Sequence, residues 1–337
     1  FSCWIKLTAL GINRVIFAGG AGASTYLRIF DTDVIGFGVA GDADYAVGPI
    51  LRDPSAWYHI VWKADTTIAD GGDGRMQIFV NGERVYNASP TSWSANYDTN
   101  IFEAELHSIG KETDGSSADR FLDGYLAEVH LVEGLALTPD YFGKTGTYGE
   151  WKPIKYGGSH GNEGFYLDFK SSGVGTAGTA TIGADRSGND NHLTSSGTAV
   201  KDQMIDTPTN NFCTISPIDV STANKLKEGS LQLEPGNGRS RGTFGVTTGK
   251  WYFEVLMLAQ TQSTVDIGIA GVVHKITGDA ANEFVRIGHP TNGADKVALY
   301  NGGTLTDNLG TVANGDIIGV FFDMDAEEVS FLVNNSA

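Results

Sequence analysis

Two carboxylic acids and a histidine, Glu103, Glu105 and His107, stand at alternate positions in the first half of the chain. In a β-strand, alternate side chains point to the same face, so these three residues would share one surface. Retaining glycoside hydrolysis uses two carboxyl groups about 5–5.5 Å apart, one as acid and one as nucleophile. A solvated strand face gives the same pattern, and the third position is a histidine rather than an acid. We therefore expect no enzymatic activity, and glycoside hydrolysis is the alternative.

A serine between glycines, Ser159, lies in a G-x-S-x-G string at residues 157–161, which is the spacing of a nucleophile elbow. Such an elbow requires a buried strand before the serine and a helix after it. The flanking residues 155–156 (KY) and 162–164 (NEG) predict neither element. We therefore predict a flexible loop there.

An aromatic pair, Trp93 and Tyr97, stands in a polar loop at residues 87–100 that also contains Asn96 and Asp98. Aromatic faces can stack on the C–H face of a sugar ring, while amides and carboxylates hydrogen-bond to its hydroxyl groups. The four residues are therefore a candidate ligand site. A structural role, in which Trp93 caps the sandwich end and is half buried, is the favoured alternative.

Strands with alternating apolar residues dominate both ends of the chain, whereas helical periodicity is nearly absent. Residues 57–64 and 76–80 are predicted strands. Asn81 and Gly82 form a predicted hairpin turn, because both turn positions need positive φ. A later strand is expected to place four residues on one face: Tyr125, Ala127, Val129 and Leu131.

The second strand series begins near residue 206, with predicted strands at 250–258, 265–272, 317–322 and 329–333. Between the two series, residues 143–205 are rich in Gly, Ser, Thr and Asn, yet they contain a strand-like stretch at 164–169 and a dense turn at 185–193. The fold class is therefore predicted to be all-β: two antiparallel β-sandwich (jelly-roll) domains, residues 1–142 and 206–337, joined by an ordered Gly/Ser/Asn-rich strap, residues 143–205.

Composition restricts the classes of partner. The 45 glycines among 337 residues fit many short strands joined by tight turns. A net charge of −17, spread along the chain, argues against nucleic acid, because phosphate binding needs a basic face. The sequence contains no stretch of about 18 apolar residues, so no membrane insertion is predicted. The two cysteines, Cys3 and Cys213, are too few for a disulfide framework.

Residues 1–142 resemble a laminin-G-like, concanavalin-A-like jelly-roll domain. The residues that carry this resemblance are 57–60 (WYHI), 78–82 (IFVNG) and 124–129 (GYLAEV). Such domains often bind calcium at a loop rim through carboxylate and carbonyl oxygens. Asp70 and Asp73 are the candidate ligands here. The alternatives are Asp42 with Asp44, or three residues of the predicted strap: Asp185, Asn189 and Asp190.

Residues 206–337 resemble a SPRY domain through residues 249–255 (GKWYFEV), 267–270 (IGIA), 315–320 (GDIIGV) and 331–334 (FLVN). The final strands of that fold would lie beyond Ala337, so we expect a fragment of a longer polypeptide whose second sandwich is incomplete at its C-terminus. SPRY domains commonly bind partners through loops at one end. The resemblance therefore makes Arg239 and Arg241 candidate binding residues, with solvation or an intrachain carboxylate pair as the alternative.

The order of segments is similar to that in virion proteins of tailed phages, especially marine ones. The matching segments are 127–143 (AEVHLVEGLALTPDYFG), 165–169 (FYLDF), 185–191 (DRSGNDN) and 206–212 (DTPTNNF), followed by SPRY. The resemblance implies a tail fibre, appendage or capsid decoration protein at the particle surface. It also implies other virion proteins as partners, in a homo-oligomer or array.

Three functions stay open at this point. The leading hypothesis is a non-enzymatic virion protein whose sandwiches bind a host-surface glycan or protein. The second is a glycan depolymerase that uses Glu103 and Glu105. The third is a purely structural component with no ligand outside the particle.

Overall fold

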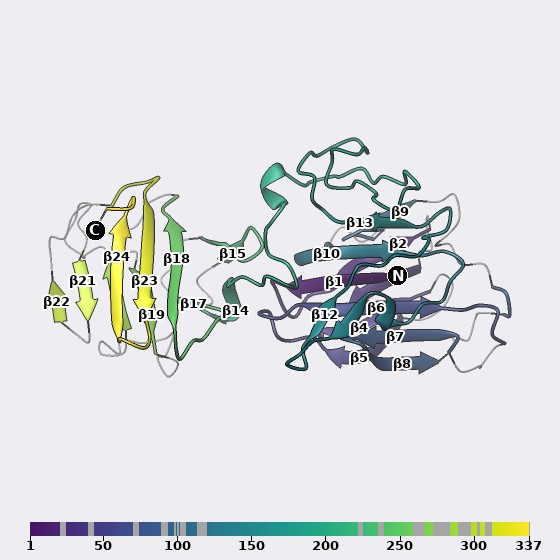
Figure 1. Ribbon diagram of the computed structural model, residues 1–337, viewed down its shortest axis with the longest axis horizontal. Helices are drawn as coiled ribbons and strands as arrows, with labels where there is room; N and C mark the ends of the chain where they lie inside the picture. The colour runs from purple at the N-terminus through teal and green to yellow at the C-terminus, as the bar shows by residue number, and fades with distance from the viewer. Residues whose placement is uncertain are drawn as a thin grey trace. The chain divides into compact units, whose positions relative to one another are not determined.

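The computed structural model (Figure 1) describes residues 1–20, 25–39, 44–69, 74–88, 94–97, 99, 101, 106–112, 120–221, 225–234, 239–258, 266–271, 284–288, 298–301, 304–306 and 312–336. The chain divides into two compact units. The first comprises Phe1–Ile218 with Glu228–Ser230, and the second comprises Asp219–Lys227 with Leu231–Ala337.

Two antiparallel sheets build the first unit. The six-stranded sheet has the order β13 (Phe165–Leu167), β10 (Gly124–Leu131), β1 (Ser2–Leu7), β6 (Tyr58–Ala64), β7 (Met76–Val80), β8 (Glu83–Ala88). The five-stranded sheet has the order β5 (Asp44–Ile50), β4 (Val34–Gly38), β3 (Thr25–Ile29), β2 (Arg14–Gly19), β9 (His107–Ile109). The predicted all-β class is confirmed.

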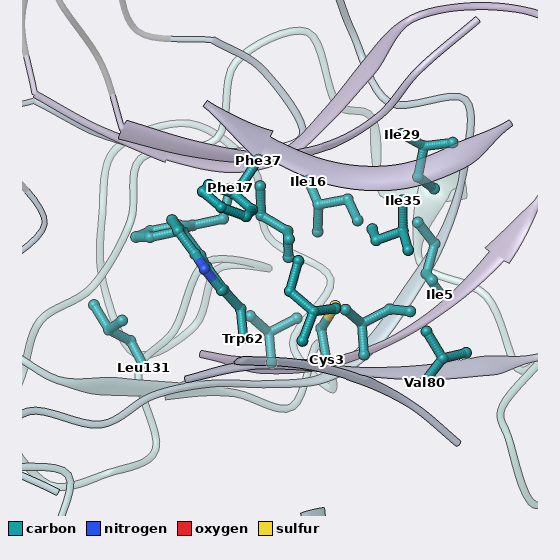
Figure 2. Packing of buried hydrophobic residues seen from close by; sticks show 14 of the residues in the cluster. Cys3, Ile5, Ile16, Phe17, Ile29, Ile35, Phe37, Trp62, Val80 and Leu131 are labelled. Carbon is teal, nitrogen blue, oxygen red and sulfur yellow. The ribbon is translucent and has the colours of Figure 1, made fainter. Parts of the chain in front are cut away.

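The core lies between these two sheets, as Figure 2 shows. Cys3 and Ile5 of β1 face Phe17, Ile35 and other apolar residues of the opposite sheet, and all four are fully buried. Alternation in each strand supplies this face, because every second side chain points inward. The hairpin between β7 and β8 turns at Asn81 (φ 50°) and Gly82 (φ 85°), as predicted.

One predicted strand face is wrong. Pairing between β1 and β10 shifts register, because Ser2 pairs with His130 but Trp4 pairs with Ala127. The extra residue is Glu128, which has a left-handed backbone (φ 49°). This β-bulge moves the residues before it to the opposite face. Val129 and Leu131 therefore lie in the core, whereas the ring of Tyr125 lies on the outer face beside Lys6.

The residues of the predicted strap fold onto the first unit. They contain β11 (Gly143–Thr145), β12 (Trp151–Pro153), β13 and the 3-10 helix η3 (Val200–Asp202), after the 3-10 helix η2 (Pro139–Tyr141). β1, in the middle of its sheet, is covered on both faces, because all six of its residues are at most 2% exposed. From here on the strap is the segment 143–212, because residues 206–212, beyond the predicted strap, also bind β1 through Lys6.

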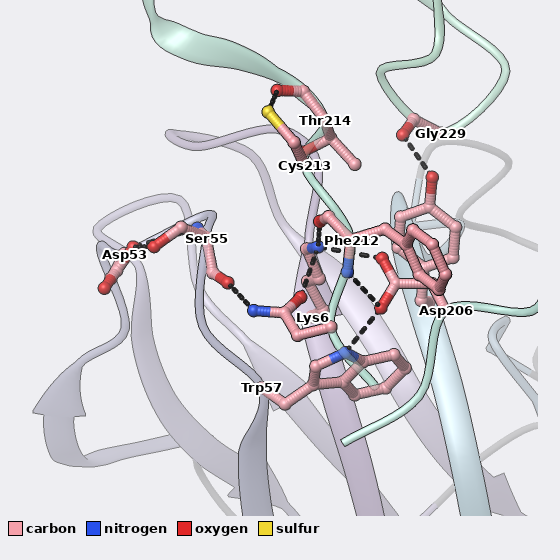
Figure 3. A network of polar contacts seen from close by, with 11 residues as sticks. Lys6, Asp53, Ser55, Trp57, Asp206, Phe212, Cys213, Thr214 and Gly229 are labelled. Atoms are coloured by element: carbon pink, nitrogen blue, oxygen red, sulfur yellow. Dashed lines mark hydrogen bonds and ion pairs between the residues drawn. The ribbon is translucent and has the colours of Figure 1, made fainter. Parts of the chain in front are cut away.

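The C-terminal end of the strap is attached by a buried lysine (Figure 3). Lys6 Nζ donates to Asp206 Oδ2 and Asn211 Oδ1 at 2.8 Å each and to the carbonyl oxygen of Phe212 at 2.7 Å. Trp57 Nε1 donates to the other oxygen of Asp206 at 2.9 Å. These bonds explain why residues 206–218 belong to the first unit, although the sequence suggested that a second sandwich begins at residue 206.

The second unit is also built of antiparallel strands. A three-stranded sheet has the order β18 (Lys250–Leu256), β23 (Ile317–Asp323), β24 (Glu328–Val333). A four-stranded sheet has the order β19 (Asp266–Ala270), β20 (Phe284–Gly288), β21 (Ala298–Asn301), β22 (Thr304–Thr306). Two-stranded sheets pair β15 (Lys225–Lys227) with β16 (Gln232–Glu234) and β17 (Ser240–Gly242) with β14 (Ile215–Val220), of which residues 219 and 220 belong to this unit. The small core contains Met257, Val312, Ile318 and Val320. In the described part of the chain, no helix has the length and apolar character needed to cross a membrane.

Candidate functional site

The outer face of the six-stranded sheet is occupied by the chain itself. Trp151 of β12 donates its indole N–H to Nδ1 of His59 at 2.9 Å. This bond requires Nδ1 of His59 to be unprotonated, so its Nε2 carries the hydrogen and donates to Ser2 Oγ, also at 2.9 Å. The His59 ring also stacks on Trp4 at 4.9 Å. An external ligand therefore finds this face covered by the strap.

The outer face of the five-stranded sheet has a different surface. Tyr26 and Arg28 of β3 and Phe30 just after it alternate along the chain, so they share this face. Opposite them on β4 stand two glycines. A Cβ added at Gly38 would lie 2.3 Å from the Tyr26 ring, and one at Gly36 would lie 2.6 Å from the Phe30 ring. The glycines thus allow both rings to lie flat against β4.

An aspartate joins two of these side chains. Asp44 accepts hydrogen bonds from the Tyr26 hydroxyl through Oδ1 and from Arg28 Nη2 through Oδ2, each at 2.5 Å. The Arg28 guanidinium also lies over the Phe30 ring, with 3.9 Å between Cζ and the ring centroid. Arg28 is 5% exposed, whereas the side chain of Asp44 is 39% exposed. The Asp44 carboxylate thus faces solvent while the buried Arg28 guanidinium and the Tyr26 hydroxyl hold it in place.

A second ion pair lies beside Tyr26. Arg120 Nη1 donates to Glu112 Oε2 at 2.7 Å, and 29% of the Arg120 side chain is exposed. Burial, followed by the hydrogen bond to Asp44, raises the pKa of Tyr26 to about 12, and the charge of Glu112 adds to the shift. The Tyr26 hydroxyl therefore keeps its proton at neutral pH.

We call these residues the Tyr26 cluster: Tyr26, Arg28, Phe30, Asp44, Glu112 and Arg120. They combine aromatic rings with guanidinium donors and carboxylate acceptors on one face of the sheet, where the side chains of Asp44 and Arg120 are 39 and 29% exposed and Arg28 and Glu112 are buried. Aromatic faces beside such polar groups are the combination that binds polyhydroxylated ligands. Each carboxylate is held by a guanidinium, so the arrangement is suited to hydrogen bonding rather than to proton transfer.

The loop predicted to bind a ligand is only partly described. Trp93 and Asp98 lie outside the described residues. Asn96 is exposed in a turn, whereas the Tyr97 side chain is partly buried and packs against the core. The fully buried Arg75 holds this turn by donating to the carbonyl oxygen of Ser94. Tyr97 thus contributes to the core, and both readings of Trp93 stay predictions.

The two predicted arginines of the second unit are part of a local network. Arg241 forms an ion pair with Asp219 through Nε, and its Nη2 lies 3.4 Å from the other carboxylate oxygen. The carbonyl oxygen of Arg239 accepts a hydrogen bond from Ser221 N at 2.9 Å. Arg241 thus has the intrachain carboxylate partner that the sequence left as an alternative, and partner binding here stays a prediction.

The candidate calcium ligands are not brought together among the described residues. Asp70, Asp73 and Asp42 lie outside them, and Asp44 is bound to Arg28 and Tyr26. Within the described ranges, no three His, Cys, Asp or Glu side chains are grouped so that they could hold a metal ion. Calcium therefore stays a prediction that rests on Asp70 and Asp73.

The strap turn at 185–191 has a structural use for its polar residues. Burial raises the pKa of Asp185, but hydrogen bonds from Tyr166 N, from Ser187 and from Asn191 N outweigh it, and the pKa ends below its usual value. Asn189 Nδ2 donates to the carbonyl oxygens of residues 161 and 164 at 2.6 and 2.9 Å. These side chains hold the turn at 185–191 against residues 161–166.

In the described residues, neither the Glu103, Glu105 and His107 pattern nor the Ser159 string forms a group of catalytic side chains. Glu103 and Glu105 lie outside the described residues. His107 Nε2 lies 2.5 Å from the carbonyl oxygen of Ile101, and its ring stacks on the core residue Phe17. Ser159 lies in a loop with no helix after it, as predicted, and the neighbouring His160 is buried against the sheet.

Sequence reasoning missed the Tyr26 cluster. The available signal was the spacing of Tyr26, Arg28 and Phe30 at every second position, followed by Gly36 and Gly38 with the same spacing. Neither pattern identifies Asp44, Glu112 or Arg120 as neighbours, because the sheet brings them together from distant positions.

Comparison with known families agrees with this architecture. Residues 1–141 match a laminin-G family model, described as the concanavalin A-like lectin/glucanases superfamily. This stretch folds as a two-sheet β-sandwich and is similar to that superfamily. The match confirms the laminin-G-like part of the predicted resemblance, and the SPRY and phage parts stay predictions. No curated protein matches the chain.

Proposed function

We propose that this protein is a non-enzymatic binding protein of a virus particle, which attaches to a host-surface glycan through the Tyr26 cluster. The observation that supports this proposal most directly is the contrast between the two outer faces of the first unit. The strap occupies one face, whereas the other carries aromatic rings, guanidinium groups and a solvent-facing carboxylate. The match of residues 1–141 to a superfamily that includes lectins points to the same class of ligand.

The place on a virus particle rests on the order of segments along the chain, which is similar to that of tailed-phage virion proteins. Many copies on one particle would turn weak single sites into strong attachment, because linked sites raise the effective concentration. We therefore expect a homo-oligomer or array that contacts other virion proteins.

Binding of the purified chain to host cells and to a panel of surface glycans tests this proposal. Arg120→Gln is expected to weaken binding at least tenfold, or about 1.4 kcal/mol. Arg186→Gln is the matched control, because its side chain is 34% exposed and pairs with the carboxylate of Asp168 in the strap. Unchanged affinity in both Arg120→Gln and Asp44→Asn, with both variants folded, would exclude the Tyr26 cluster. Repeating the measurement with EDTA tests the predicted calcium.

A purely structural role is the second candidate, and one observation favours it. The outer face of β18 and β23 exposes four large apolar side chains, each between 40 and 53% accessible: Tyr252, Leu256, Ile317 and Phe321. Exposed apolar patches of this kind mark contact surfaces. This candidate predicts assembly of the purified chain together with no binding to any susceptible cell. A glycan depolymerase is the remaining alternative, and release of new reducing ends that is lost in Glu105→Gln would support it.

A further inference from the structure

Three of the seven histidines meet where the strap covers the six-stranded sheet. His59 and His130 stand on the outer face of β6 and β10, and His160 comes from the strap. All three are buried, with exposed fractions of 0, 3 and 7%. Histidine is the side chain whose ordinary titration falls closest to neutral pH, so their grouping at one internal contact requires an explanation.

Two of these imidazoles bind each other. His130 Nδ1 lies 3.1 Å from His160 Nε2, and the rings are stacked with centroids 5.4 Å apart. One nitrogen must donate its hydrogen and the other must accept it, so the contact requires that the accepting ring be neutral. A proton on the accepting nitrogen would place two N–H groups face to face at this distance. The pair therefore keeps this hydrogen bond only while the accepting ring is neutral.

The third imidazole depends on neutrality for the same reason. His59 Nδ1 accepts the hydrogen of Trp151, so protonation at Nδ1 would remove the acceptor on which β12 is fastened. The nitrogen Nε2 is already committed to Ser2. Each of the two contacts is therefore lost when its accepting nitrogen is protonated.

The carboxylates around the cluster are bound elsewhere. Glu128 accepts the hydroxyl of Tyr166 at 2.6 Å, and Glu133 accepts the backbone N–H groups of residues 162 and 163. Asp185 acts on His160 through its charge, but its oxygens accept hydrogen bonds from the strap turn. Three other titratable groups face the imidazoles: Tyr166, whose ring stacks on His130 at 4.3 Å, Tyr156, whose ring contacts His160, and the amino group of Phe1, whose charge acts on His130. Among the described residues, no carboxylate hydrogen-bonds to the three imidazoles as a counter-ion.

We propose that these three histidines form a pH-sensitive latch, which releases the strap from the six-stranded sheet in acid and uncovers that face. The latch is separate from the Tyr26 cluster, so it does not depend on the proposed glycan site. Release would expose an aromatic surface that includes Trp4, which is 2% exposed while the strap is bound, and would free the partly buried Trp151 indole from the His59 ring. A device of this kind would respond to acidic surroundings by presenting a second, apolar contact face.

The electrostatics agree with the geometry. Burial lowers the pKa of His59 to about 3 and, together with the charge of His160, lowers that of His130 to about 3. Burial also lowers the pKa of His160. Once the strap opens, each imidazole returns to an ordinary pKa of about 6.5, so the open form binds protons more tightly. Acid therefore favours opening as the pH falls below about 6.5.

Hydrogen exchange followed by mass spectrometry tests the latch on the whole chain, with labelling times scaled for the intrinsic exchange rate at each pH. Between pH 7.5 and 4, peptides covering residues 150–167 and β1 are expected to lose protection reversibly, while peptides of β3 and β4 keep theirs. In the variant His130→Gln/His160→Gln, the midpoint is expected to fall by at least one pH unit. His107→Gln, on the five-stranded sheet, is the control and should leave the midpoint unchanged.

Two results would overturn the proposal. One is a strap that stays protected in the wild-type chain down to the pH at which β3 and β4 also exchange, since release would then be only part of unfolding. The other is an unchanged midpoint in the double variant. If the double variant does not fold, His160→Gln alone serves, and the wild-type profile decides the first question without any substitution.

Discussion

Replacing Lys6 with methionine is expected to loosen the C-terminal end of the strap. Methionine fills a similar volume, but it cannot donate the three hydrogen bonds that Lys6 makes to Asp206, Asn211 and Phe212. Lys6 is fully buried, and the side chain of Asp206 is 4% exposed. The substitution therefore leaves a carboxylate away from water without its counter-ion.

The expected loss in the free energy of unfolding follows from the burial of this ion pair. Breaking a buried ion pair by removing one partner costs about 3–5 kcal/mol, most of it from the charge left unpaired. Asp206 keeps the N–H groups of Trp57 and Phe212 as donors, so we expect the lower end, about 3 kcal/mol. In Lys6→Met/Asp206→Leu no charge is left buried, so the double variant should lose less than the sum of the two single losses, by at least about 1 kcal/mol.

Urea unfolding at neutral pH, followed through a probe confined to the first unit, measures these losses. Lys201→Met is the control, because Lys201 forms an ion pair with Glu228 while 65% of its side chain is exposed, and its loss should be too small to measure. A loss below about 1 kcal/mol in Lys6→Met, or losses that simply add in the double variant, would refute the reasoning that this pair is buried and coupled.

Two further predictions concern the Tyr26 cluster. Gly38→Ala should destabilise the first unit by about 1–3 kcal/mol, because its Cβ would lie 2.3 Å from the Tyr26 ring, whereas Gly178→Ala, with no atom within 4 Å, should be close to neutral in the same urea experiment. In a spectrophotometric titration, the difference between wild type and Tyr26→Phe should show one tyrosine with a pKa of about 12. Asp44→Asn should lower that pKa, because it removes a negative charge that disfavours the phenolate, and an unchanged pKa would contradict the assigned hydrogen bond.

Local sequence was a good guide where neighbours along the chain decide the structure. The hairpin at Asn81 and Gly82 was predictable, because positive φ is a property of those residues themselves. The closing hairpin of β23 and β24 was predictable from alternation. The face of Tyr125 was not, because one extra residue at Glu128 inverts the pattern before it, and alternation carries no mark of a bulge.

The same division holds for function. The sequence by itself determined an all-β chain, its strands and its sharpest turns, since these depend on the period of apolar residues and on backbone preferences. Only the tertiary structure decided which face the strap covers. It placed Asp44 against Arg28 and fastened Asp206 to Lys6, across 16 and 200 positions of the chain. Ion pairs and covered faces depend on which strands become neighbours in the sheets, and that choice is made by the packing of the whole core rather than by any local pattern.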